Sequence, residues 1–444
     1  MAFSDAGDFC IEAPPGPGEP MHRNPVRRDE IESAEQLRGL LAAGVDLDGW
    51  TVQAVDLSGV CGLEQARLDG CLFLGCTFAD GQQEQRVRAG GGLVLPRLGG
   101  LPYDPHRSAL YTAEELLAGM EAGGVTGSRD YAIYDHAHQQ RRRPGGPSIR
   151  EALAQRIHDH AIDDALAEFL DGHRGRGAVG IMGGHGTPRS DPWYARVARL
   201  AWLLGRAGYL VVTGGGPGIM EAGNLGAFLA AQADAAVLDA ALELLRPADR
   251  FDGGQPVGSP GFERAAAAHV ATARQVVERF GCGSDGPGVS LAIPTWFYGH
   301  EPTNSFASAH AKYFDNSLRE EGLLAVATAG VVHAPGSAGT LQEIFQDLCQ
   351  NHYGTYGLRS PMVLFGSRRY AAEHALIQGF IEHSGRQSLY GDLLALVDEP
   401  QQALEFIEEH PPRPVAGWPP AEAAALETDD GPSNPTSTRE GREP

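Results

Sequence analysis

The sequence predicts an α/β protein: a doubly wound, Rossmann-like parallel sheet with an additional N-terminal region. Two observations lead to this prediction. Short apolar runs alternate with helix-like patterns from residue 148 to residue 410, and two of these runs end in glycine-rich loops that open helices. Strands that alternate with helices form a parallel sheet covered on both faces. Right-handed crossovers make such a sheet doubly wound.

The expected elements follow in chain order. Apolar runs of strand length predict strands at 178–182, 209–214, 289–294, 330–335 and 361–366. Helical spacing predicts helices at 148–170, 192–206, 338–350 and 368–381. The segment 231–288 is long for a single connection and is partly helical, so we expect an insertion there.

Composition divides the chain into four parts. Residues 1–30 are rich in Pro, Gly and charge and are expected to be flexible, and residues 411–444 are expected to form a disordered tail. Residues 31–147 form an N-terminal accessory region, and residues 148–410 form the Rossmann-like domain. The stretch RRRPGGPS at 141–148 is interpreted as the linker between them, with its arginines in solvent.

A five-residue period runs through the accessory region between residues 55 and 80. Leu68, Phe73 and Phe78 share one phase, and small residues occupy the phase two positions earlier. The pattern resembles pentapeptide repeats, whose coils stack such side chains inward in a β-helix. Three clear repeats make less than one coil, so we expect a short structural flap.

The charge balance excludes several classes of function. The 444 residues include 35 basic and 57 acidic ones, a formal net charge of −22. A polymer of nucleic acid is therefore not expected as a partner, because phosphate backbones are bound by basic surfaces. The six cysteines have no CxxC spacing, and the apolar stretch at 322–335 is too short to cross a membrane. With no signal-peptide pattern at the N-terminus, we expect a soluble cytoplasmic protein without a membrane partner.

The first glycine-rich loop, VTGGGPGIME, spans residues 212–221. Gly214, Gly215 and Gly216 allow a sharp turn and a close approach of the backbone to a ligand. The helix that begins near Gly218 would present free N–H groups and a positive dipole end to a phosphate. The loop is neither a GxGxxG nor a Walker sequence, and a plain tight turn remains the alternative.

The second glycine-rich loop, HAPGSAGTLQE, spans residues 333–343. Gly336 and Gly339 leave room for an anion, and the Thr340 hydroxyl can donate to it. Thr340 and Glu343 alternatively form only a capping box. Two such loops at the carboxyl ends of parallel strands favour a shared nucleotide-phosphate site, because ligands of open α/β sheets bind at that edge.

The two loops carry a family resemblance. Residues 213–227 and 334–345 resemble the paired GGGxxGxM and PGGxGTxxE motifs of the "Lonely Guy" family of nucleoside 5′-monophosphate phosphoribohydrolases, long mislabelled as lysine decarboxylases. The Met220–Glu221 pair and the chain length are closer to the bacterial long-chain nucleotide 5′-monophosphate nucleosidases. Ser337 replaces the second glycine of PGG, which either adds a hydroxyl donor or narrows the phosphate pocket.

The resemblance implies hydrolysis of the N-glycosidic bond of a small-molecule nucleotide, with Glu343 and Arg319 as catalytic residues. Glu221 is assigned to the ribose hydroxyls. The expected substrate-binding set is Gly214, Gly215, Gly216, Gly218, Met220, Glu221, Gly336, Ser337, Gly339 and Thr340. The resemblance also implies a homo-oligomer, and neither a cofactor nor a metal is expected.

Two other interpretations are open. A pyridoxal-phosphate decarboxylase would need a Schiff-base lysine, and Lys312 is the only lysine in the chain. A sensor that binds nucleotides without cleaving them would use the same loops. Among residues after other strands, His185, Thr187 and Arg189 are candidates to touch base or phosphate, and the aromatics of 295–304 either stack on a base or pack in the core.

Overall fold

The computed structural model describes residues 30–281 and 286–415. Its main sheet has seven strands, and every neighbouring pair is parallel. Across the sheet lie β12 (Leu394–Val397), β11 (Met362–Phe365), β9 (Gly330–His333), β5 (Ala178–Met182), β6 (Leu210–Thr213), β7 (Ser290–Ala292) and β8 (Ala309–His310). The predicted Rossmann-like parallel sheet is therefore confirmed.

The order of the strands creates a switch point next to β5. From β5 the chain builds outward through β6, β7 and β8 on one side, and then returns to add β9, β11 and β12 on the other. The loops that leave β5 and β9 therefore diverge at the carboxyl edge of the sheet, which is where open α/β sheets bind ligands.

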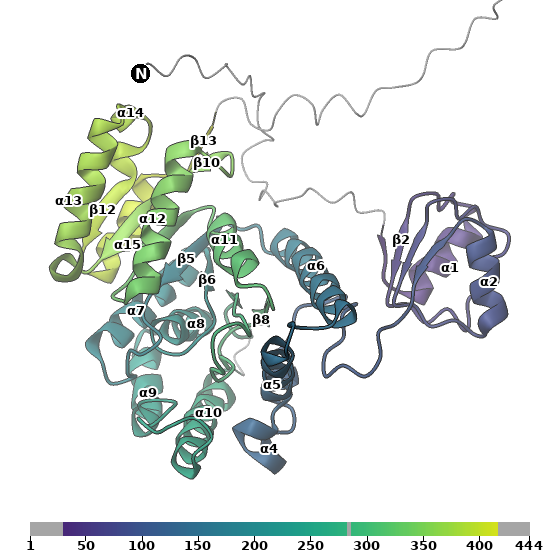
Figure 1. Cartoon of the computed structure of the whole chain (residues 1–444). Helices are drawn as coiled ribbons and strands as arrows, with labels where there is room; N and C mark the ends of the chain where they lie inside the picture. The colour runs from purple at the N-terminus through teal and green to yellow at the C-terminus, as the bar shows by residue number, and fades with distance from the viewer. Residues whose placement is uncertain (1–29, 282–285, 416–444) are drawn as a thin grey trace, which may run out of the picture.

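Helices cover both faces of the sheet (Figure 1). The helices after the first N-terminal unit are α3 (Ala113–Leu117), α4 (Met120–Gly123), α5 (Arg129–Arg142), α6 (Ile149–Gly172), α7 (Pro192–Arg206), α8 (Ile219–Leu229), α9 (Ala236–Leu245), α10 (Pro260–Phe280), α11 (Asn316–Val326), α12 (Ala338–Tyr353), α13 (Ser367–His383), α14 (Gln387–Tyr390) and α15 (Pro400–Glu409). Within the described residues, none of the helices is long and apolar enough to cross a membrane.

Alternate residues of each strand face opposite cores. In β5, Val179 and Ile181 pack with residues of α7, α8 and α15 in one core. Ala178 and Met182 face the other core, where α5, α6 and α11 contribute the partners. Helix α7 begins as predicted because the Asp191 side chain accepts the Trp193 N–H, and it ends at Arg206.

The segment between α8 and β7 holds the expected insertion. It forms α9 and α10, which pack on each other and lie together at the lower edge of the molecule in Figure 1. These helices pack into the core beside α7 and α8 through the side chains of Leu238, Ala241 and Val276. The insertion is thus part of the domain rather than a separate unit.

The N-terminal unit is larger than the expected flap. It contains β1 (Glu30–Ile31), β2 (Thr51–Gln53), β3 (Leu72–Leu74) and β4 (Leu93–Leu95) in one parallel sheet, with α1 (Ala34–Ala42) and α2 (Gly81–Ala89). Leu68, Cys71 and Phe73 are buried in its core, so the five-residue period does mark inward-facing side chains. The size of this unit was underestimated from the sequence, because β1 and β4 lie outside the five-residue repeats.

Two expected boundaries differ from the structure by a few residues. Arg141 lies inside α5, and its guanidinium donates to the carbonyls of Trp296, Phe297 and Phe314, so it is not a solvated linker residue. The expected tail is ordered at its start, because β13 (Arg413–Pro414) pairs antiparallel with β10 (Leu358–Arg359). The rest of that tail, and the N-terminal segment expected to be flexible up to residue 29, lie outside the described residues.

Candidate functional site

The two glycine-rich loops meet at one edge of the sheet, and the loop after β5 joins them. The Gly184 N–H donates to the Pro335 carbonyl at 3.1 Å, and the Gly184 carbonyl accepts the Ile219 N–H at 3.1 Å. A Cβ added to Gly336 would lie 3.0 Å from the Gly184 nitrogen. The loops after β5, β6 and β9 therefore form one continuous surface, as the strand order requires.

Arg319 and Glu343, the two residues expected to be catalytic, lie side by side. Their nearest charged atoms, Nη1 and Oε1, are 3.6 Å apart, and the side chains are 12% and 15% exposed. The Arg319 Nε also donates to the Ile293 carbonyl at 3.1 Å, and its Nη2 lies against Gly214. The pair thus sits directly on the first glycine loop.

The surroundings of Glu343 change its acidity. Burial raises the pKa of its carboxyl above the ordinary glutamate value, and the Arg319 charge opposes this rise only in part. A carboxylate with a raised pKa is a better proton acceptor than one in water. Glu343 therefore has the electrostatic character of a general base.

The second glycine loop is the more open anion site. Ser337, Ala338 and Gly339 are exposed where the loop enters α12, and the Ser337 side chain makes no capping bond. The first N–H groups of a helix have no partner within the helix, so they are available to a phosphate. The Thr340 hydroxyl lies against Gly336 in the same turn. Ser337 has an ordinary φ of −105°, so serine replaces glycine there without backbone strain.

The first glycine loop is more enclosed than the second. All of its glycines are buried, and Gly215 and Gly218 have positive φ values of 73° and 69°. The Gly215 N–H donates to the Thr213 hydroxyl, and the Ile219 N–H at the start of α8 is occupied by Gly184. These two N–H groups are therefore not available to a phosphate. The glycines of this loop are covered by the side chains of Arg319, Met220 and Glu301.

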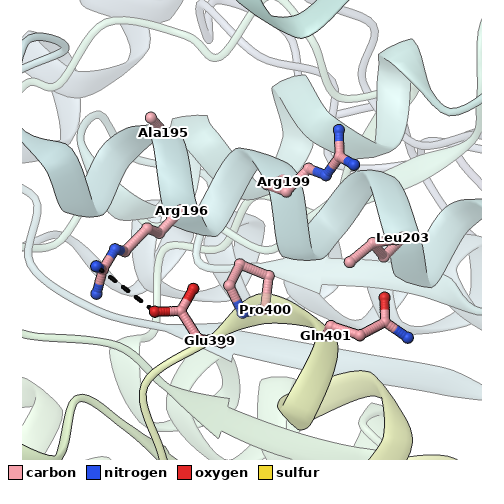
Figure 2. Close-up of a pocket in the computed structure, with 7 residues that line it drawn as sticks. All are labelled: Ala195, Arg196, Arg199, Leu203, Glu399, Pro400 and Gln401. Atoms are coloured by element: carbon pink, nitrogen blue, oxygen red, sulfur yellow. Dashed lines mark ion pairs between the residues drawn. The ribbon is translucent and has the colours of Figure 1, made fainter. Parts of the chain in front are cut away.

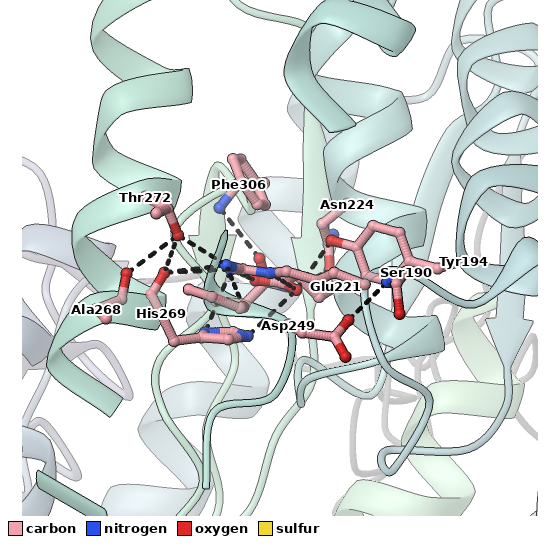
Figure 3. A network of polar contacts seen from close by, with 12 residues as sticks. Ser190, Tyr194, Glu221, Asn224, Asp249, Ala268, His269, Thr272 and Phe306 are labelled. Atoms are coloured by element: carbon pink, nitrogen blue, oxygen red, sulfur yellow. Dashed lines mark hydrogen bonds and ion pairs between the residues drawn. The ribbon is translucent and has the colours of Figure 1, made fainter. Parts of the chain in front are cut away.

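Glu221 is occupied by other side chains, as Figure 3 shows. The Arg189 guanidinium donates hydrogen bonds to both oxygens of its carboxylate, at 2.5 and 2.9 Å. The Tyr194 hydroxyl donates to the same carboxylate at 2.9 Å. Burial would raise the pKa of Glu221, but Arg189 and His269 hold it at about 2. Its assignment to ribose hydroxyls is not supported by this geometry, and Arg189 is likewise committed to the ion pair.

The Arg189–Glu221 pair holds the insertion to the sheet. Arg189 also donates to the Thr272 hydroxyl of α10 at 2.8 Å. His185 and Thr187 line a cavity of about 90 Å³ next to this pair. Ordinary ligand sites have volumes of about 300–1,000 Å³, so this cavity is too small for a nucleotide.

Lys312 is a buried structural residue. Its ammonium donates to both oxygens of Asp130 at 2.7 and 2.9 Å, and it lies over the Trp296 ring. Trp296 is buried and donates its indole N–H to the same carboxylate. A Schiff base would require Lys312 to leave this ion pair, so the structure gives the decarboxylase interpretation no support.

A second, larger hollow of about 390 Å³ lies between α7 and the start of α15 (Figure 2). Arg196 and Arg199 line it, and Arg196 lies 3.7 Å from Glu399. None of the predicted site residues contributes to it.

Comparisons with known proteins concern the fold. The chain matches no protein-family model and no curated protein. Among solved structures, it is similar to a molybdenum cofactor binding protein from the phototrophic bacterium Rippkaea orientalis, with 16% identity, a TM-score of 0.29, and coverage of 52% of this chain and 96% of that one. It is also similar to the structure of TM1055, with 18% identity, a TM-score of 0.31, and coverage of 52% and 99%. The molybdenum cofactor carrier protein from Chlamydomonas reinhardtii matches with 14% identity, a TM-score of 0.29, and coverage of 52% and 96%.

Sequence reasoning missed part of the site. Glu301 belongs to the loop that follows β7, for which only the aromatics, Tyr298 among them, had been considered. The position of Glu301 after a strand of the sheet was the available signal, because every such loop reaches the ligand-binding edge.

Proposed function

We propose that the protein hydrolyses the N-glycosidic bond of nucleoside 5′-monophosphates and releases a free base and ribose 5-phosphate. The observation that carries this proposal is the Arg319–Glu343 pair, held where three sheet-edge loops meet and beside the open start of α12. The start of a helix can bind the phosphate of a phosphorylated sugar. A neighbouring carboxylate with a raised pKa can act as the base for water that attacks C1′ of the same sugar.

The 5′-phosphate would bind at the start of α12. The N–H groups of Ala338 and Gly339 and the Thr340 hydroxyl supply the donors. Binding energy gained at the phosphate, away from the reacting bond, positions the sugar against Glu343.

The chemistry needs one water molecule. As the C1′–N bond breaks, positive charge develops on C1′ and the ring oxygen, and the Glu343 carboxylate stabilises it. Water then forms the new C1′–O bond and gives one proton to Glu343. The departing base nitrogen takes up one proton from solvent and Glu343 later returns its proton to solvent, so that one water is consumed overall. Arg319 donates hydrogen bonds toward the phosphate or the departing base.

The phosphate anchor leads to the first prediction. We expect the nucleoside without its phosphate to have a kcat/KM at least about 100-fold lower, because two or more charge-assisted hydrogen bonds are lost. Thr340→Val should weaken cleavage of the nucleotide and leave the residual cleavage of the nucleoside unchanged. Comparing AMP with adenosine in a base-release assay measures this, and equal rates for the two would contradict the anchor.

The second prediction concerns pH. Because Glu343 acts in its deprotonated form and burial raises its pKa, kcat/KM should fall in acid with an apparent pKa above the ordinary glutamate value. Arg319 partly opposes that rise, so Arg319→Gln should move this acid limb to higher pH. A pH–rate profile of both proteins tests the sign. A limb that stays in place or moves to lower pH would show that Glu343 is not the titrating base.

A further inference from the structure

The loop between β7 and β8 is anchored firmly at both ends. On one side, the Trp296 indole donates to Asp130 at 2.7 Å, and on the other the Thr303 hydroxyl donates to the same carboxylate at 3.0 Å. Asn304 adds a bond to Asn224 of α8 at 2.9 Å. These anchors are all buried. They fix the position of the residues between them, 297–301, which we call the β7–β8 tip.

The β7–β8 tip is hydrogen-bonded to α11. Tyr298 is 65% exposed, and its hydroxyl is bonded to Asn316 at 2.8 Å and to Glu320 at 3.0 Å. Asn316 lies one turn before both Arg319 and Glu320 on α11, because residues three and four apart are neighbours on a helix. The tip therefore lies along the helix that carries the catalytic arginine.

Glu301 is the residue of the tip that enters the site. Its Oε2 lies against Gly216 in the first glycine loop, where the Met220 methyl group also packs. The side chain is half-buried, and it has no ion-pair partner among the residues that the structure describes. Glu301 is thus a carboxylate available to a ligand, whereas Glu221 is not.

The chemistry around Glu301 suits hydroxyl groups rather than a phosphate. A carboxylate repels a phosphate, and the N–H groups of Gly215 and Ile219 are already bonded within the protein, so Glu301 does not mark an anion cradle. An ionised carboxylate only accepts hydrogen bonds and has lone pairs for two adjacent donors. The vicinal 2′- and 3′-hydroxyls of a ribose, next to the C1′ that water would attack with Glu343 as its base, provide such donors.

We propose that Glu301 binds the ribose 2′- and 3′-hydroxyls of the substrate, the role that the sequence had assigned to Glu221. The proposal rests on the proposed function in so far as the substrate is a ribonucleotide. It makes the β7–β8 tip the part of the site that distinguishes ribose from deoxyribose.

The test compares the effect of one substitution in the protein on two substrates, one with and one without the ribose hydroxyls. Glu301→Ala should lower kcat/KM for a ribonucleoside 5′-monophosphate by about 10-fold to 100-fold, the usual worth of a hydrogen bond to a charged group. For the matching 2′,3′-dideoxynucleotide the loss should be less than about threefold, because no hydroxyl is left to bind. Glu278→Ala, an exposed change on α10, is the control and should leave both rates unchanged. Equal losses on the two substrates would overturn the assignment.

A binding measurement separates this inference from the hydrolase proposal. Calorimetric titration should show that ribose 5-phosphate binds wild-type protein about 10-fold or more tightly than it binds Glu301→Ala, with 2-deoxyribose 5-phosphate showing a smaller difference. If wild-type protein releases no base but this difference is found, the hydrolase proposal fails and the Glu301 assignment stands. If base is released but both sugars bind the variant and the wild type alike, the Glu301 assignment fails alone.

Discussion

Glu343→Gln should reduce base release by at least about 100-fold, the usual contribution of a positioned general base, while nucleotide affinity stays close to that of the wild type. Glutamine has nearly the same shape, but it neither accepts the proton of water nor carries the charge that stabilises the developing cation. The effect should therefore appear in kcat rather than in binding.

The measurement combines a base-release assay with calorimetric titration of the nucleotide. Glu382→Gln, an exposed residue near the end of α13, is a matched control and should behave as the wild type. Near-wild-type turnover of Glu343→Gln would show that another group performs the chemistry.

The second large effect is expected on stability. Glu221→Ala should lower the free energy of unfolding by about 3–5 kcal/mol, because it leaves the buried Arg189 guanidinium without its partner. Replacing both residues with apolar ones, Arg189→Met with Glu221→Leu, should recover much of this loss since no buried charge is then unpaired.

Denaturant unfolding measures both variants. Glu243→Ala breaks the exposed pair with Arg246 and should cost less than about 1 kcal/mol. If Glu221→Ala were as mild as this control and instead weakened ribose 5-phosphate binding, Glu221 would regain the role in ribose binding that the sequence suggested.

The Glu221 case shows where sequence reasoning ends. The motif places this glutamate on the first turn of a helix after a glycine loop, which is a fair position for a ligand contact. Its actual partners, Arg189 and Tyr194, come from the loop after β5 and from α7, and only the folded sheet brings them within reach. Nothing in the local pattern of residues reports such a long-range pairing.

Long periodic elements were predictable for the opposite reason. The apolar run of β5 and the capped pattern of α7 contain their own start and stop signals, and both agree with the structure residue by residue. β8 has only two residues, so no periodicity could reveal it. The predicted linker at 141–148 begins two residues too early, because α5 extends to Arg142 and Arg141 donates to carbonyls of the β7–β8 loop and of Phe314, far away in the sequence.

For the site, the family resemblance was enough to select Glu343 and Arg319, and the structure brings these two residues together. The difference in accessibility between the two glycine loops was not predictable. Both have the composition of an anion cradle, but the Gly184 carbonyl occupies the first N–H of α8 and leaves the start of α12 open. Glu301 carries no motif and is selected only by its contact with Gly216.

The most direct measurement of the central claim is product analysis across purine and pyrimidine nucleoside 5′-monophosphates, with free base and ribose 5-phosphate quantified in the same reaction. The account predicts that at least one nucleotide gives both products in equal amounts, and that Glu343→Gln gives neither. Nucleotides that bind the wild-type protein and are recovered intact would contradict it and would identify a nucleotide sensor instead.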